Sequence, residues 1–111
     1  MPPDPAPRSA GGQDAAALIA AQLAGLFGCS ARVALQGERA WASAAFTGTR
    51  YCFAVEWDPT TKADMRNNLA KRLPDHEFDL PRHFVADLVV REQSDRRWLI
   101  EILALVDPVQ N

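Results

Sequence analysis

The sequence has no excess of positive charge, and this limits the partners that it suits. Twelve lysines and arginines stand against fourteen aspartates and glutamates, which gives a net charge of −2 at pH 7. Proteins dedicated to nucleic acids usually carry a basic excess, because neutralising phosphates supplies most of their non-specific affinity. The composition therefore argues against nucleic acid as the main partner.

Cysteine is scarce as well, since Cys29 and Cys52 are the only two in the chain. They belong to no C-x-x-C pair, so the sequence has neither the spacing of a zinc site nor a redox motif. Unpaired cysteines are most often buried, and two free thiols fit a reducing compartment. We therefore expect a cytoplasmic protein with buried thiols, no metal and no cofactor.

The sequence also lacks the short motifs that hold nucleotides or carry nucleophilic catalysis. It contains no glycine-rich phosphate loop, no G-x-G-x-x-G and no G-x-S-x-G. Both histidines, His76 and His83, lie in a segment rich in carboxylates, shortly before Asp87. Imidazole and carboxylate groups suit acid–base catalysis or a metal site, but this spacing matches no helical metal motif. A non-catalytic role is favoured, and a small enzyme or metal/ligand-binding domain that uses residues 76–87 is the alternative.

Residues 15–31 form a run of 17 residues without charge in a chain that is 23% charged. A transmembrane helix needs about 20 strongly apolar residues, and this run is rich in alanine instead. An export signal needs a basic N-terminal flank, whereas Asp4 and Asp14 outnumber Arg8 in this one. We therefore expect no membrane span and no export signal here.

The same run has the composition and spacing of an amphipathic helix. Alanine and leucine are strong helix formers, and Gly28 suits a left-handed helix end. One apolar stripe recurs at helical spacing and consists of Leu18, Ile19, Leu23, Leu26 and Phe27. The opposite face holds only small residues, namely Ala17, Ala21, Ala24 and Gly25. This small face is either a second packing surface or simply an exposed alanine face.

The next part of the chain predicts three strands. Apolar residues alternate over residues 50–57, and weaker strand patterns cover residues 32–36 and 40–46. Residues 37–39 and 47–49 have the composition of turns, with Gly48 able to take a positive φ. Such short turns imply that the three strands pair antiparallel.

A second helix is expected over residues 59–73, because Asp58 and Pro59 suit its start and Pro74 enforces its end. Three residues at a spacing of four are expected to face the core, namely Met65, Leu69 and Leu73. The outer face is basic and carries Lys62, Arg66, Lys71 and Arg72. A basic helix face is usually solvated, although it also suits a phosphate or an acidic partner.

A final hairpin alternates so regularly that its register can be predicted. Leu88 is expected opposite Ile102 and Val90 opposite Ile100, which gives one fully apolar face. The other face mixes apolar and charged residues, namely Val85, Asp87, Val89, Arg91, Leu99, Glu101, Leu103 and Leu105. A face of this kind is too apolar for plain solvent and too charged for a core. It is typical of a partner surface or of a ligand groove.

These segments predict one α+β domain over residues 13–107, with a five-stranded antiparallel sheet and two helices in the order α-β-β-β-α-β-β. Residues 1–12, which are rich in proline, and residues 108–111 are expected to be tails. The first five elements resemble a double-stranded RNA-binding domain, but Thr60-Thr61-Lys62 stands where that family has a lysine pair. The complete order is similar to that of small secretion-chaperone-like dimeric domains, which also begin with an apolar helix.

We therefore expect a non-catalytic protein-interaction or ligand-binding module that acts as a homodimer and has no membrane partner. Besides the enzyme alternative, weak RNA binding through the basic helix over residues 59–73 stays open. The candidate ligand or interface residues are Asp87, Arg91, Glu101, Trp57, His76 and His83. Trp57 is included because an aromatic residue at a strand end either packs in the core or lines a pocket.

Overall fold

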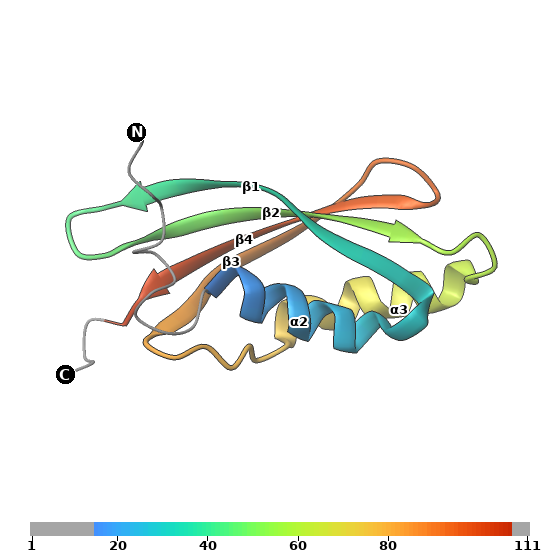
Figure 1. Ribbon diagram of the computed structural model, residues 1–111, viewed down its shortest axis with the longest axis horizontal. Helices are drawn as coiled ribbons and strands as arrows, with labels where there is room; N and C mark the ends of the chain where they lie inside the picture. The colour runs from blue at the N-terminus through green and yellow to red at the C-terminus, as the bar shows by residue number, and fades with distance from the viewer. Residues whose placement is uncertain (1–14, 108–111) are drawn as a thin grey trace, which may run out of the picture.

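The computed structural model describes residues 15–107, in which two helices pack on one face of a four-stranded antiparallel sheet (Figure 1). The tails expected at residues 1–12 and 108–111 lie outside these residues. The elements are α2 (Ala15–Phe27), β1 (Ala31–Ala42), β2 (Thr47–Trp57), α3 (Ala63–Arg72), β3 (His83–Glu92) and β4 (Arg97–Val106), and a 3-10 turn follows each helix. Because the strand order is β1-β2-β4-β3, β1 and β3 are the edges of the sheet.

The α+β class is confirmed, but the expected five-stranded sheet is wrong. Residues 37–39 form no turn and instead continue β1, which is 12 residues long. Leu35 lies opposite Phe53 and Gly37 lies opposite Cys52, so Gln36 has no partner and forms a β-bulge. A bulge bends and twists a strand without ending it. One long strand therefore replaces the two short ones that were expected.

The turn between β1 and β2 also lies earlier than expected, at residues 43–46 rather than 47–49. The N–H of Ser43 donates to the carbonyl of Phe46 at 2.8 Å. The hydroxyl of Ser43 accepts the N–H of Phe46 at 3.1 Å. A serine that binds its neighbouring backbone in this way closes a turn without any glycine.

Gly48, expected in that turn, lies inside β2 and has no positive φ. A Cβ at this position would collide with the carbonyl oxygen of Ala104 and would lie 2.8 Å from the Cα of Leu105. Glycine is therefore required here because β2 and β4 approach each other closely, not because the chain turns.

The core lies between the helices and one face of the sheet. α2 contributes Ile19, Leu23 and Phe27, which confirms the centre of the expected stripe, while Leu18 and Leu26 are partly buried. The central strands β2 and β4 contribute alternate residues that are at most 5% exposed, namely Tyr51, Phe53, Val55, Trp57, Trp98, Ile100, Ile102 and Ala104. The most apolar part of the chain thus lies between the two helices and the central strands β2 and β4.

The predicted register of the last hairpin is confirmed, with Leu88 opposite Ile102 and Val90 opposite Ile100. The end of the first helix is confirmed too, because Gly28 follows α2 with a φ of 61°. This left-handed conformation is easy for glycine and strained for other residues.

The second helix begins later than expected, at Ala63. Asp58 instead closes a local turn, because its Oδ1 accepts the N–H of Thr60 at 2.8 Å and the hydroxyl of Thr60 at 2.7 Å. Leu69 and Leu73 are buried as expected, but Met65 is 50% exposed. The late start shortens α3, and Met65 lies on its first turn, outside the core.

Candidate functional site

The sheet face opposite the helices is covered by no helix or strand of residues 15–107, and both helices lie along the other side (Figure 1). We call this surface the open face. Its members alternate along each strand with the core residues. They are Arg32, Ala34, Gly37, Arg39, Trp41, Arg50, Cys52, Ala54, Glu56, Phe84, Asp87, Val89, Arg91, Arg97, Leu99, Glu101, Leu103 and Leu105.

A second bulge changes which residues of β3 belong to the open face. The register shifts between Val85 and Asp87, so that Phe84 lies opposite Leu105 and Val85 lies opposite Ala104. Val85 was expected on the mixed face, but it packs against the core instead. Because one extra residue reverses the alternation, Phe84 takes the place on the open face that was expected for Val85.

One end of the open face is apolar and aromatic. The rings of Phe46 and Phe84 meet edge to face with their centroids 5.9 Å apart. Leu103 and Leu105 lie beside them and are only 6% and 5% exposed. Trp41, opposite Gly48 on the edge strand, completes this end and is half-buried. We call Trp41, Phe46, Phe84, Leu103 and Leu105 the aromatic end.

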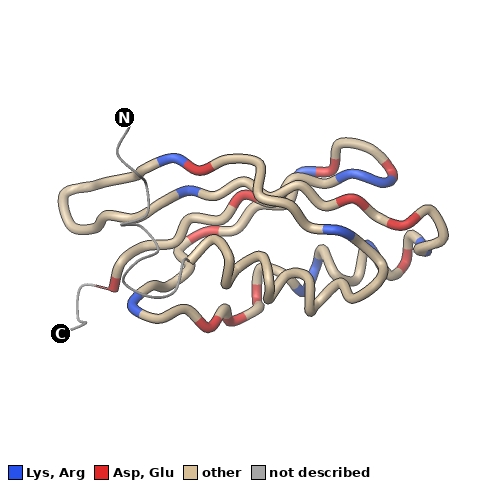
Figure 2. Tube along the Cα trace, viewed as in Figure 1, with Lys and Arg blue, Asp and Glu red and all other residues tan. Residues whose placement is uncertain are grey.

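The middle of the open face contains two of the expected site residues in contact. Arg91 Nε lies 3.4 Å from Glu101 Oε2, across the pair β3 and β4. Asp87 lies on the same face, opposite Leu103. Figure 2 shows that basic and acidic positions are spread over all four strands rather than gathered by sign. Exposed ion pairs of this kind add little stability.

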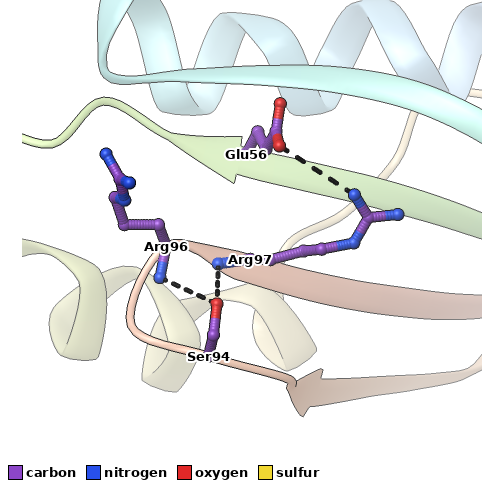
Figure 3. Close-up of polar contacts among 4 residues, drawn as sticks. All are labelled: Glu56, Ser94, Arg96 and Arg97. Atoms are coloured by element: carbon purple, nitrogen blue, oxygen red, sulfur yellow. Dashed lines mark hydrogen bonds and ion pairs between the residues drawn. The ribbon is translucent and has the colours of Figure 1, made fainter.

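The far end of the open face, beside the β3–β4 turn, is polar. Glu56 and Arg97 point toward each other, with Oε2 and Nη1 3.9 Å apart (Figure 3). The hydroxyl of Ser94 accepts the N–H groups of Arg96 and Arg97 at 3.3 and 3.1 Å, and thereby fixes the turn. The open face thus changes from aromatic at one end to charged at the other.

Two arginines lie directly opposite each other on the open face, Arg39 on β1 and Arg50 on β2. Neither forms an ion pair with any residue of the described chain. Like charges in directly opposed cross-strand positions destabilise a sheet. Both line a hollow of about 320 Å³ with Gly37, Glu38, Cys52 and Glu101, which we call the Gly37 hollow.

The two thiols lie in different surroundings and form no disulfide. Cys29 is exposed, so its expected burial is wrong. Cys52 is half-buried on the open face, where burial and the nearby Glu101 carboxylate raise its pKa and Arg91 lowers it less. A raised pKa keeps the thiol protonated, and a protonated thiol is a poor nucleophile. Cys52 therefore has the surroundings of a packed residue rather than of a catalytic one.

Neither histidine expected at a catalytic or metal site belongs to the open face, although His83 directly precedes Phe84 in β3. The ring of His76 packs edge to face on Phe78, with centroids 4.6 Å apart. His83 Nδ1 lies 2.9 Å from the carbonyl oxygen of Pro81. No group of three metal-ligating side chains occurs within residues 15–107. The segment between α3 and β3, in which His76 lies, also contributes the buried Leu80 to the core.

Trp57 lies in the core at the end of β2. It is 3% exposed, and its ring meets those of Phe27 and Trp98 edge to face with centroids 5.1 and 4.9 Å apart. Its Nε1 is buried and has no hydrogen-bond partner among the described residues. So small an exposed area leaves little of this side chain for a ligand.

Sequence reasoning missed Arg39, Arg50, Trp41 and Phe46 as members of one surface. The expected turn at residues 37–39 placed Arg39 in a loop and divided β1. Only the continuity of β1 through its bulge aligns Arg39 with Arg50. The clear alternation of β2 from residue 50 onward was the available signal, because it already placed Arg50 on the same face as Cys52.

No protein-family model matches the chain, and neither the curated proteins nor the solved structures give a match. Neither helix in residues 15–107 is long and apolar enough to cross a membrane. The fold and the site define the class only as a two-layer α+β protein with one uncovered sheet face.

Proposed function

We propose that the protein is a non-catalytic interaction module that acts as a homodimer, with the open faces of two copies packed against each other. The supporting observation is the apolar content of this face. An antiparallel sheet with one solvated face normally shows polar residues there. On this face Phe84 is 38% exposed and Trp41, Val89 and Leu99 are half-buried, whereas Leu103 and Leu105 are buried by their neighbours. Exposed patches of this kind typically mark interaction surfaces.

The area of the open face is close to that of a typical dimer interface. Four strands about 4.8 Å apart and 10 residues long, at about 3.3 Å per residue, make a rectangle of roughly 19 by 33 Å. Its flat area is roughly 600 Å², and the accessible surface of its side chains is larger, against about 800 Å² per partner in a standard interface. Two sheets also stack readily face to face, about 10 Å apart. A second copy of the chain is therefore a partner of the right size and shape.

The catalytic and RNA-binding alternatives have less support. The two histidines face Phe78 and Pro81 rather than each other or a carboxylate cluster. On the basic helix, Arg66 Nη1 donates to the carbonyl of Thr61 at 2.8 Å. This arginine therefore already has a hydrogen-bond partner within the fold.

The two free thiols suit a reducing compartment such as the cytoplasm, where we place the protein.

Sedimentation of the full chain at about 10 to 100 μM tests this proposal, because standard interfaces form dimers in this range. We expect a dimer for the wild type and a monomer for Val89→Arg, which adds a charge in the middle of the open face. The matched control is Ala21→Arg on the small face of α2, which we expect to stay dimeric. A monomeric wild type contradicts the proposal. If Ala21→Arg abolishes the dimer and Val89→Arg does not, the interface lies on α2 rather than on the open face.

A further inference from the structure

Three charged residues without ion-pair partners lie in one row across the open face. Pairing across the strands places Arg39, Arg50, Leu103 and Asp87 side by side on β1, β2, β4 and β3. The two arginines occupy one edge of the row and the carboxylate occupies the other. None of the three charges forms an ion pair with a residue of the 15–107 region. We call these four residues the charged row.

We propose that the two copies are related by a two-fold axis parallel to the strands, so that Arg39 of one copy binds Asp87 of the partner subunit and Arg50 lies beside this pair, over Leu103 of the partner subunit. This inference rests on the proposed homodimer and specifies its geometry. Rotation about an axis along the strands leaves each row of cross-strand neighbours at the same position along the strand direction. It exchanges the two edges of the sheet. It therefore stacks β1 over β3 and β2 over β4. The charged row then faces itself in reverse, with Arg39 over Asp87 at both ends and Arg50 over Leu103 between them.

The alternative axis, perpendicular to the strands, leaves the arginines without partners. It stacks β1 over β1 and β2 over β2. The register places no carboxylate on the open face of β1 and only Glu56 on that of β2. Glu56 already faces Arg97. The parallel axis is therefore the one that relieves the repulsion between Arg39 and Arg50.

Two further features agree with the parallel axis. It places Trp41 over Phe84 of the partner subunit, so that the aromatic ends of both copies stack together. It also places the Gly37 hollow, about 320 Å³ in volume, under the row that contains Val89 and Glu101 of the partner subunit. Val89 of the partner subunit thus faces Gly37, which has no side chain. Charges at an interface mainly fix orientation and exclude wrong pairings, so the charged row acts as the element that selects this axis.

Charge exchange in the full chain tests the axis, with the dimer dissociation constant measured by sedimentation equilibrium. We expect Asp87→Arg and Arg39→Glu each to raise the dissociation constant at least about tenfold, and the double variant to return to within about threefold of the wild type. Arg32→Gln, on the same face but outside the charged row, is the control and should change the constant less than about twofold. Circular dichroism verifies folding of each variant. If Asp87→Arg does not fold, Asp87→Asn replaces it, with an expected weakening of about fivefold.

The outcomes separate this inference from the proposed homodimer. A monomeric wild type overturns both. A dimer whose dissociation constant is unchanged in Asp87→Arg and Arg39→Glu overturns only the axis. Weakening in both single variants without recovery in the double variant also overturns the axis, because the two residues then act independently. Recovery in the double variant supports direct pairing between copies.

Discussion

Gln22 and Asp79 are joined by two hydrogen bonds, although they lie 57 residues apart. The side chain of Gln22 donates to the carbonyl of Asp79 at 2.8 Å, and its oxygen accepts the N–H of Asp79 at 2.9 Å. An amide side chain used in this way pairs with the backbone as a neighbouring strand would. These two hydrogen bonds connect the segment between α3 and β3 to α2, next to the buried Leu80.

We expect Gln22→Ala to lower the free energy of unfolding by about 1–2 kcal/mol, because a donor and an acceptor both lose their partners. Urea denaturation measures this change. Gln36→Ala is the control, since Gln36 is an exposed glutamine that we expect to contribute less than about 0.5 kcal/mol. Equal losses in the two variants would show that the pair with Asp79 contributes nothing.

The regular alternation of the last hairpin was sufficient to predict its register and its buried face. Alternation with a period of two is a local property, and it fixes which side of a strand meets the core. The mixed character of half of the open face was predictable for the same reason. Arg91 and Glu101 accordingly lie together on the face where the sequence placed them.

The two bulges could not be predicted, and they account for the main errors. Gly37-Glu38-Arg39 suits a turn as well as a bulged strand, because both tolerate glycine. The choice depends on whether residues after it pair with β2, for example Trp41 with Gly48. This pairing in turn requires the close approach of β2 to β4 at Gly48, a contact between segments far apart in the sequence. Such long-range contacts cannot be predicted from local sequence patterns.

Gly25 and Gly28 should respond in opposite directions to alanine. Gly28 has a φ of 61°, where a Cβ is strained, so Gly28→Ala should cost about 1 kcal/mol of stability. Gly25 lies inside α2 with nothing within 4 Å of an added Cβ, so Gly25→Ala should add about 0.5–1 kcal/mol. Thermal or urea denaturation of the pair checks the signs. A loss of stability in Gly25→Ala would mean that the small face of α2 packs closely against another surface.

The turn at Asp58 should make part of the stability depend on pH. Hydrogen bonds from the N–H and hydroxyl of Thr60 lower the pKa of Asp58 from its ordinary value of 3.8. A lowered pKa in the folded state means that the carboxylate stabilises the fold above the unfolded pKa. This contribution is lost as the pH falls through the folded pKa.

We therefore expect the wild type to lose more stability than Asp58→Ala when the pH falls from about 5 to about 2.5. Urea midpoints across this range measure the difference, and the carboxyl carbon shift of Asp58 gives its pKa directly. Asp58→Asn is the control, because it keeps a side-chain acceptor for Thr60 without a titrating group. Parallel pH profiles for the wild type and Asp58→Ala would contradict the role of this carboxylate.

The two thiols should differ in reactivity. At pH 8 we expect Cys29, which is exposed, to react with a disulfide reagent at least about tenfold faster than Cys52, because only the thiolate attacks. Single-cysteine variants, Cys29→Ser and Cys52→Ser, assign each rate. Glu101→Gln should accelerate the reaction of Cys52, since the carboxylate of Glu101 helps to raise the pKa of this thiol.

The reaction of Cys52 also reports on the open face, which contains it. If two copies pack through this face, raising the protein concentration through the dissociation constant should slow the labelling of Cys52 and leave that of Cys29 unchanged. Val89→Arg should remove this dependence on concentration while the raised pKa persists, because burial and Glu101 act within one chain. A Cys52 rate that is slow at every concentration in both proteins would assign its protection to the single chain and would argue against the homodimer.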